Sequence, residues 1–185
     1  DPIEYDIPGV SQTQINVKKG LTFATGLRNV LRQDPDIIMV GEIRDQETAV
    51  MGIQSALTGH LVFSTLHPND AASAVTRLLD LGIEPYLVSS SLLAVLAQRL
   101  VRCVCPRCAV SSPLGSSELQ ALSLESLPVE NQQGSRGRGC ESCRGTGYRG
   151  RLGIFELLIV GDQVREAIQR QANAAQIRDV AREGG

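Results

Sequence analysis

A short apolar strand followed at once by a carboxylate is the most informative feature of the sequence. Residues 37–40 are Ile-Ile-Met-Val, and Gly41 and Glu42 come directly after them. A run of this length is too short for a helix and is typical of a buried parallel strand. Because ligands of open α/β sheets lie outside the carboxyl ends of the strands, we expect Glu42 where a phosphate-bound Mg²⁺ would be held.

A second strand-like run, residues 61–65, lies between two histidines. His60 precedes this run and His67 follows it. An extended strand rises about 3.3 Å per residue, so the two imidazoles lie roughly 23 Å apart and cannot share one metal ion. We expect His67 at the same sheet edge as Glu42, and His60 at the opposite edge. Two strands that place Glu, Ser, Thr and His at one edge indicate nucleotide chemistry.

Three further charged residues are weaker candidates. Glu4 is a second carboxylate, but no strand within the sequence directs it. Arg28 and Arg32 are four positions apart on a predicted helix, and a pair with this spacing shares one face and could contact a phosphate, although most such pairs face solvent. The sequence contains no G-x-x-x-x-G-K-[ST] phosphate cradle and opens without Met, which predicts a piece of a longer protein.

Four of the five cysteines form two C-x₂-C pairs. Such pairs can place four thiolates in the tetrahedron that Zn²⁺ prefers, and with all positions filled by protein the site would be structural. The alternatives are disulfides or inert core thiols, and a lone C-x₂-C could be a redox site. The loop of some thirty residues between the pairs is longer than that of a usual zinc ribbon. The predicted ligands are Cys105, Cys108, Cys140 and Cys143, and Cys103 is predicted to be a free thiol.

The bulk composition narrows the function classes. The chain of 185 residues has a net charge of −2 and no Trp. A near-neutral chain lacks the basic face that nucleic acid requires, so nucleic acid is not expected as a partner. The longest apolar run, residues 92–96, is far too short to span a membrane, and no signal peptide opens the sequence. The length and composition predict one ordinary domain with an aliphatic core and a small appendage.

The remaining sequence predicts alternating helices and strands, which form a parallel sheet wrapped by helices. Thr22, Asp45 and either Asn69 or Asp70 are suited to cap helices. A helix over 89–101 is apolar on most of its surface and is therefore expected to be buried. Other expected elements are an extended hairpin at 7–17, helices at 23–32, 46–57, 70–81, 117–127, 162–170 and 173–182, and a strand at 152–160.

Together, these motifs resemble the secretion/pilus ATPase superfamily, and most closely the type II secretion system ATPases of the general secretion pathway protein E family. Residues 1–4, Asp-Pro-Ile-Glu, resemble the end of that family's Asp box. Residues 37–45 resemble its atypical Walker B segment, and residues 58–67 its His box. The cysteine pairs separate the chain from pilus-retraction ATPases, which typically lack them. Residues 5–14 favour secretion over pilus assembly.

The resemblance implies a fold and a role for each candidate residue. The fold would be the second half of a RecA-like P-loop NTPase core, with a parallel sheet flanked by helices. This core would occupy 1–102, a tetracysteine zinc subdomain 103–150, and a C-terminal helical subdomain 151–185. The implied roles are water activation by Glu4, Mg²⁺ binding by Glu42, γ-phosphate contact by His67 with support from His60, and charge stabilisation by Arg28 and Arg32.

The implied protein is a cytoplasmic homo-hexamer, peripheral at the inner membrane. It would use ATP, Mg²⁺ and Zn²⁺ and act with the inner-membrane platform and recruiting proteins of the secretion system. As an ATP hydrolase it would power pseudopilus assembly, whereas the 185-residue piece alone is expected to be inactive and not to form the hexamer. A type IV pilus assembly ATPase is the nearest alternative. A zinc-ribbon interaction module without ATPase activity is an alternative of another class.

Overall fold

The computed structural model describes residues 3–184. Contacts within the chain divide it into two compact units, which we call the core unit and the cysteine unit. The core unit comprises Asp1–Ala97 and Glu156–Gly185, and the cysteine unit comprises Gln98–Phe155. Among the described residues, no helix is long and apolar enough to cross a membrane. The three functional parts expected from the sequence, with boundaries after 102 and 150, stay a prediction.

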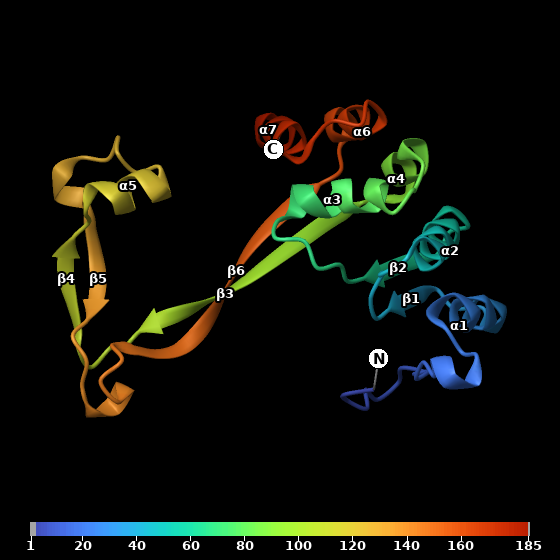
Figure 1. Ribbon diagram of the computed structural model, residues 1–185, viewed down its shortest axis with the longest axis horizontal. Helices are drawn as coiled ribbons and strands as arrows, with labels where there is room; N and C mark the ends of the chain where they lie inside the picture. The colour runs from blue at the N-terminus through green and yellow to red at the C-terminus, as the bar shows by residue number, and fades with distance from the viewer. Residues whose placement is uncertain (1–2, 185) are drawn as a thin grey trace. The chain divides into compact units, whose positions relative to one another are not determined.

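Two parallel strands carry the first candidate residues. Strands β1 (Ile37–Val40) and β2 (Leu61–Ser64) pair along their whole length, and helices α1 (Phe23–Val30) and α2 (Gln46–Leu57) lie beside them (Figure 1). Neighbouring residues of a strand point to opposite faces, and Ile38 and Val40 are the buried pair, packed with Leu27 of α1. The strands predicted at 37–40 and 61–65 and the α/β fold class are confirmed.

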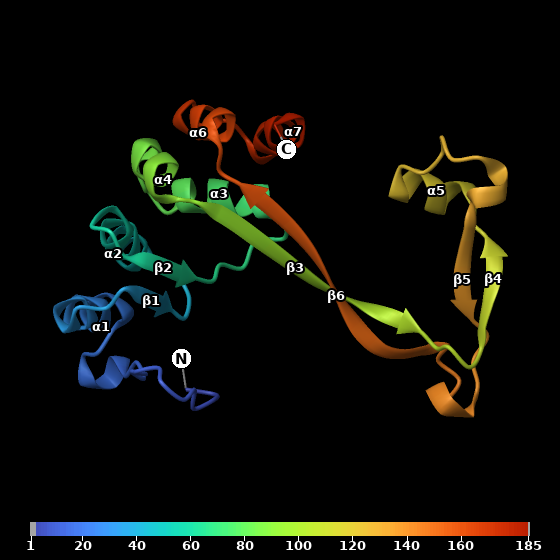
Figure 2. The same ribbon diagram turned by 180° about the vertical axis from the view of Figure 1, so that it is seen from behind.

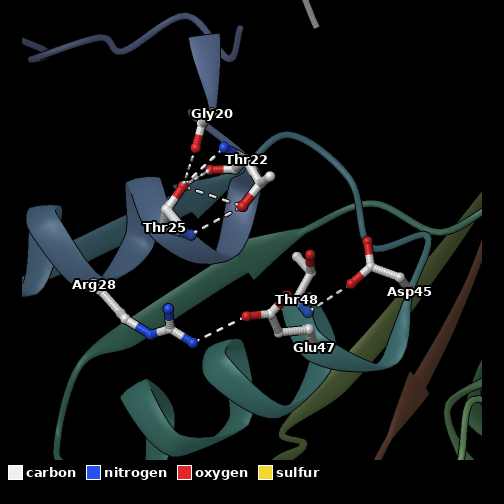
Figure 3. Close-up of polar contacts among 7 residues, drawn as sticks. All are labelled: Gly20, Thr22, Thr25, Arg28, Asp45, Glu47 and Thr48. Carbon is white, nitrogen blue, oxygen red and sulfur yellow. Dashed lines mark hydrogen bonds and ion pairs between the residues drawn. The ribbon is translucent and has the colours of Figure 1, made fainter. Parts of the chain in front are cut away.

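Polar caps begin the first three α-helices of the chain. The helices are α1 (Phe23–Val30), α2 (Gln46–Leu57) and α3 (Ala71–Asp80). Each cap side chain accepts a hydrogen bond from a backbone N–H three positions later, which satisfies one of the free donors of the first turn. The caps are Thr22, Asp45 and Asp70, and the first two are drawn in Figure 3. The choice between Asn69 and Asp70 is thereby resolved.

The main hydrophobic core lies among helices from both ends of the chain. Helix α4 (Pro85–Ser91) contacts α6 (Asp162–Gln169), and α3 contacts α7 (Ala174–Glu183), as Figures 1 and 2 also show. Val75, Val88, Ile168 and Ile177 are fully buried in this core. The two predicted C-terminal helices are confirmed, and their burial explains why they belong to the core unit.

The helix predicted over 89–101 is wrong. Helix α4 ends at Ser91, and the chain continues as strand β3 (Ala94–Val104), paired with β6 (Tyr148–Ile159). The run is not buried either, since Leu93 and Leu96 are more than half exposed. A short apolar run fits the periodicity of a helix and that of a strand. Its partner strand lies some fifty residues away, so local patterns do not reveal it, and pairing with this partner selects the extended form.

The extended hairpin predicted over 7–17 is also wrong. This segment has a turn near Gly9 but no strand, and its polar positions bind the backbone instead. The Gln12 side chain accepts from the Ile7 N–H and donates to the Tyr5 carbonyl, both at 3.0 Å. Such bonds offer the backbone an alternative to a strand ladder. A 3-10 turn (η1, Val17–Lys19) follows.

The cysteine unit is built from a hairpin and tight turns. Strand β4 (Ala109–Pro113) pairs antiparallel with β5 (Gln133–Gly137), and helix α5 (Ser116–Leu122) lies between them in the chain. The short helix predicted at 117–127 is therefore confirmed in its first part. Two 3-10 turns complete the unit, η3 (Val129–Asn131) and η4 (Glu141–Cys143).

Candidate functional site

Glu42 is held at the carboxyl end of β1. Its side chain is buried, with 3% of the residue exposed. The two strand ends are fixed to one another, because the Ile43 N–H donates to the Thr65 carbonyl at 3.0 Å and the Thr65 hydroxyl donates to the Gly41 carbonyl at 2.6 Å. The carboxylate is thus directed by the backbone, as the sequence predicted.

Two cationic or polar side chains contact the Glu42 carboxylate. The Arg44 guanidinium forms an ion pair with Oε2, and the His67 Nε2 lies 3.2 Å from the same oxygen. The hydrogen bond from Arg44 is the main reason why the pKa of Glu42 lies below its usual 4.5, with a smaller contribution from His67, and burial opposes both. Glu42 is therefore an ionised carboxylate at neutral pH, a suitable oxygen ligand for Mg²⁺.

The two histidines lie at opposite ends of β2, as predicted. The His67 side chain is 75% exposed although its Nε2 contacts Glu42. The Nδ1 of His60 lies 2.9 Å from the Ser55 carbonyl and 3.2 Å from the Thr58 hydroxyl, which ties it to the end of α2. His60 lies at the start of β2, whereas His67 forms with Glu42 and Arg44 a group that we call the carboxylate cluster.

The two arginines lie in α1 and in the turn that follows it, and their shared face stays a prediction. Helix α1 ends at Val30, and Arg32 lies in the following 3-10 turn (η2, Leu31–Gln33). Arg28 forms an exposed ion pair with Glu47 of α2 at 2.9 Å (Figure 3). Within the described residues, neither arginine is joined to Glu42 by an ion pair.

Glu4 lies outside the carboxylate cluster. It is exposed, in a segment without helix or strand, and no hydrogen bond joins it to Glu42 among residues 3–184. Asp1 and Pro2 of the expected Asp box lie outside the described residues. The structure therefore brings together Glu42 and His67 but not the other nucleotide-site candidates.

Arg44 is a further candidate residue, which was not among those predicted from the sequence. It stands two positions after Glu42 in the Gly-Glu-Ile-Arg-Asp segment, and this position is the signal that could have identified it. A cavity of about 480 Å³ begins beside it. The polar residues that line this cavity are Arg44, His67, Ser73, Thr76, Arg77 and Asp80. Three of them are basic, which suits an anionic ligand.

The four predicted cysteines form one cluster. Their Sγ atoms all lie within 4.8 Å of one another, and this is the one group of potential metal ligands within residues 3–184. Three of the separations are 3.9, 3.9 and 3.7 Å. A tetrahedron with Zn–S bonds of about 2.3 Å requires Sγ–Sγ distances of roughly 3.8 Å, so the geometry fits Zn²⁺. The thiols are unpaired, which excludes the disulfide alternative in this structure.

Backbone N–H groups favour a thiolate at this cluster. Burial opposes ionisation of Cys143, but hydrogen bonds from the Cys140 and Gly147 N–H groups, at 3.2 and 3.3 Å, lower its pKa to about 6. Burial raises the pKa of Cys108 to about 11. Gly139, Gly145 and Gly147 all have positive φ, a conformation that glycine adopts without strain, so glycines form the tight turns beside the cysteines. Cys103 lies outside the cluster as predicted.

The fold is that of the pilus and secretion ATPases. The chain resembles the pilus retraction motor PilT in its crystal structure with bound ADP, with a TM-score of 0.55 and 27% identity, over 86% of this chain and 34% of that one. The chain belongs to the type II/IV secretion system protein family, whose sequence model matches residues 1–185.

Two curated relatives show how the chain lies within this family. It is 56% identical to the type II secretion system protein E of Aeromonas hydrophila over 183 residues, which are 99% of this chain and 36% of that protein. It is 53% identical to the type IV pilus assembly ATPase PilB of Thermus thermophilus, over 100% of this chain and 21% of that protein. The chain thus spans about a third or less of the length of these relatives.

Proposed function

We propose that this chain is part of a hexameric ATPase that powers protein secretion across the outer membrane by ATP-driven assembly of a pseudopilus. The observation that carries the proposal is the ionised, buried Glu42 between Arg44 and His67, at the edge where an α/β sheet binds its ligand. Membership of the family and the 56% identity to a type II secretion protein E support secretion as the process.

The proposed chemistry assigns a task to each side chain. Glu42 would hold Mg²⁺, which supplies charge neutralisation at the phosphates when bound. His67 would contact the γ-phosphate from its position beside Glu42. Glu4 would orient and deprotonate the attacking water, and Arg28 and Arg32 would stabilise the charge of the transferred group. His60 would act indirectly, because it fixes the start of β2.

The proposal also covers the location of the ATPase, its partners and its structural metal ion. We propose a cytoplasmic location at the inner membrane, with the platform and recruiting proteins of the secretion system as partners. Zn²⁺ in the four-cysteine cluster would be structural, since four protein ligands leave no open position. The type IV pilus assembly ATPase stays a second candidate because of the 53% identity to PilB.

The experiment uses a longer protein of this family that has a phosphate cradle and carries residues 1–185 of this chain. Glu4→Gln should lower kcat about 10²–10⁴-fold, the range of a positioned general base, and Glu42→Gln should weaken Mg²⁺-dependent turnover. Glu84→Gln, an exposed carboxylate in the core unit, is the matched control. Equal activity of all three variants would contradict the proposal.

A second experiment separates the two processes. The same longer protein is expressed in one strain that lacks its type II secretion ATPase and in another that lacks its pilus assembly ATPase. Restored secretion of an exoprotein without restored piliation supports the first function. Piliation without secretion favours the second candidate. If the cysteine unit binds a partner and the protein hydrolyses no nucleotide, the zinc-ribbon interaction module is favoured.

A further inference from the structure

His67 is carried by a connector that has no regular structure of its own. Residues 65–70 join β2 to α3, and none of them lies in a helix or strand. The imidazole is 75% exposed, so packing around it does not fix its place over Glu42. Its position must therefore depend on how the two ends of the connector are held.

The first end of the connector is held by the sheet. The Thr65 carbonyl accepts from the Ile43 N–H at 3.0 Å, and the Thr65 hydroxyl donates to the Gly41 carbonyl at 2.6 Å. Both bonds lie just beyond the carboxyl ends of β1 and β2, on either side of Glu42 in the sequence. Two residues further along, the His67 side chain meets Glu42.

The second end is held by residues from the far end of the chain. Asp70 caps α3 by accepting from the Ser73 N–H at 2.9 Å, and its Oδ1 also pairs with the Arg178 guanidinium of α7 at 3.1 Å. The neighbouring Ala71 N–H donates to the Glu156 carboxylate of β6 at 3.1 Å. The pair of Arg178 and Asp70 is only about one third exposed, at 35% and 27% of the side chains, so water screens it incompletely.

We propose that Arg178 is a positioning residue for His67. Through its ion pair with Asp70 it fixes the end of the connector, so that the imidazole stays over Glu42. The inference rests on the proposed function, because His67 matters only if it serves the nucleotide reaction. It adds that the C-terminal helix takes part in setting the geometry of that site, some 110 positions from His67 in the sequence.

The first test does not require activity. The chain has two histidines, so the imidazole NMR signals of His67 and His60 can be followed together, with His60 as an internal reference. Arg178→Gln should shift or broaden the His67 signals and leave those of His60 in place, and Arg178→Lys should restore them. Asp70→Asn keeps an efficient helix cap but loses the ion pair, so it should match Arg178→Gln.

Arg170→Gln is the matched control, because Arg170 is also paired with a carboxylate, Glu166, on a C-terminal helix but lies away from the connector. It should leave both histidines unchanged. His67 signals that stay unchanged in Arg178→Gln would overturn the inference. Equal shifts of His67 and His60 would overturn it too, because they indicate general loosening of the core unit.

The second test uses the longer protein with the phosphate cradle. Arg178→Gln should lower kcat about tenfold with a KM for ATP within about twofold of the original, since a misplacement of 1 Å can cost about 10²-fold in rate. Arg178→Lys should recover most of the loss. A moved His67 signal with unchanged kcat would also overturn the inference. Absence of ATPase activity in the unaltered protein would instead refute the proposed function, and the imidazole test would still decide the positioning of His67.

Discussion

At the scale of single residues, the carboxylate cluster is the feature that sets the chemistry. Glu42 is 3% exposed, yet its charge is stabilised by Arg44 and His67. A buried carboxylate without such partners would gain a proton, because removal from water disfavours the charged form. The two neighbours therefore keep Glu42 available as an anionic ligand.

The lowered pKa of Glu42 predicts how stability depends on pH. The folded carboxyl binds a proton less readily than the unfolded one, so its contribution is complete above the ordinary pKa of 4.5 and is lost as pH falls through the lower folded value. Glu42→Gln should flatten the fall of the unfolding free energy below about pH 4.5. Urea unfolding at a series of pH values measures this. Glu84→Gln serves as control, and a curve of Glu42→Gln parallel to that of the unaltered chain would contradict the prediction.

At the scale of elements, local side-chain caps fix where the core helices begin. The Thr22 hydroxyl accepts from the Thr25 N–H, and the Thr25 hydroxyl accepts from the Thr22 N–H in return (Figure 3). This reciprocal pair satisfies two donors of the first turn of α1. The same helix carries Arg28, which forms its ion pair with Glu47 of α2.

Removal of this cap should cost a measurable part of the stability. We expect Thr22→Ala to lower the unfolding free energy by about 1 kcal/mol, because the Thr25 N–H loses its acceptor at the start of α1. Thr22→Ser keeps the hydroxyl and should stay close to the original value. Urea unfolding of the core unit, followed by far-UV circular dichroism, compares the two variants. Equal losses for alanine and serine would show that the methyl group, not the cap, matters.

A close approach of two backbones in the cysteine unit leads to a third prediction. A Cβ added to Gly137 would lie 2.0 Å from the Gly147 carbonyl oxygen, and backbone cannot move aside as a side chain can. Gly137→Ala should destabilise the unit by about 1–3 kcal/mol, the range for overpacking. At the control position, Gly115, the nearest atom would be 3.5 Å away. Thermal unfolding together with zinc content tests both variants, and equal behaviour of the two would refute the steric argument.

At the scale of the whole molecule, the two units are stabilised by different means. The core unit has a large aliphatic core that includes Val75, Ile168 and Ile177. In the cysteine unit, all of whose residues are described, Leu119 is the one buried side chain besides Cys105 and Cys143. So small a core cannot offset the entropy of ordering nearly sixty residues. A bound metal ion would supply the missing stability.

Removal of the metal ion should therefore unfold the cysteine unit and leave the core unit folded. We expect one Zn²⁺ per chain, and a chelator should raise hydrogen exchange across 98–155 with little change in the core unit. Structural zinc contributes about 10–16 kcal/mol of apparent binding energy in small peptides. Cys140→Ser should abolish zinc binding, whereas Cys103→Ser, outside the cluster, should retain it. Equal zinc content in both variants by elemental analysis would contradict the assignment.

Several features could be predicted because their causes are local. The strand at 37–40, the caps Thr22 and Asp45 and the C-terminal helices follow from patterns within a few residues of one another. The four cysteines were recognisable because metal ligation requires a fixed spacing of thiols. The position of Glu42 was predictable because a buried strand directs the residue that follows it.

Other features were decided by the tertiary structure, because their partners are far apart in the sequence. The run at 89–101 satisfies helical and extended patterns alike, and pairing with β6 makes part of it a strand. The ion pair of Asp70 and Arg178 joins elements more than a hundred positions apart, which no local pattern specifies. Local chemistry thus determined which groups the protein carries, whereas long-range packing decided which of them meet.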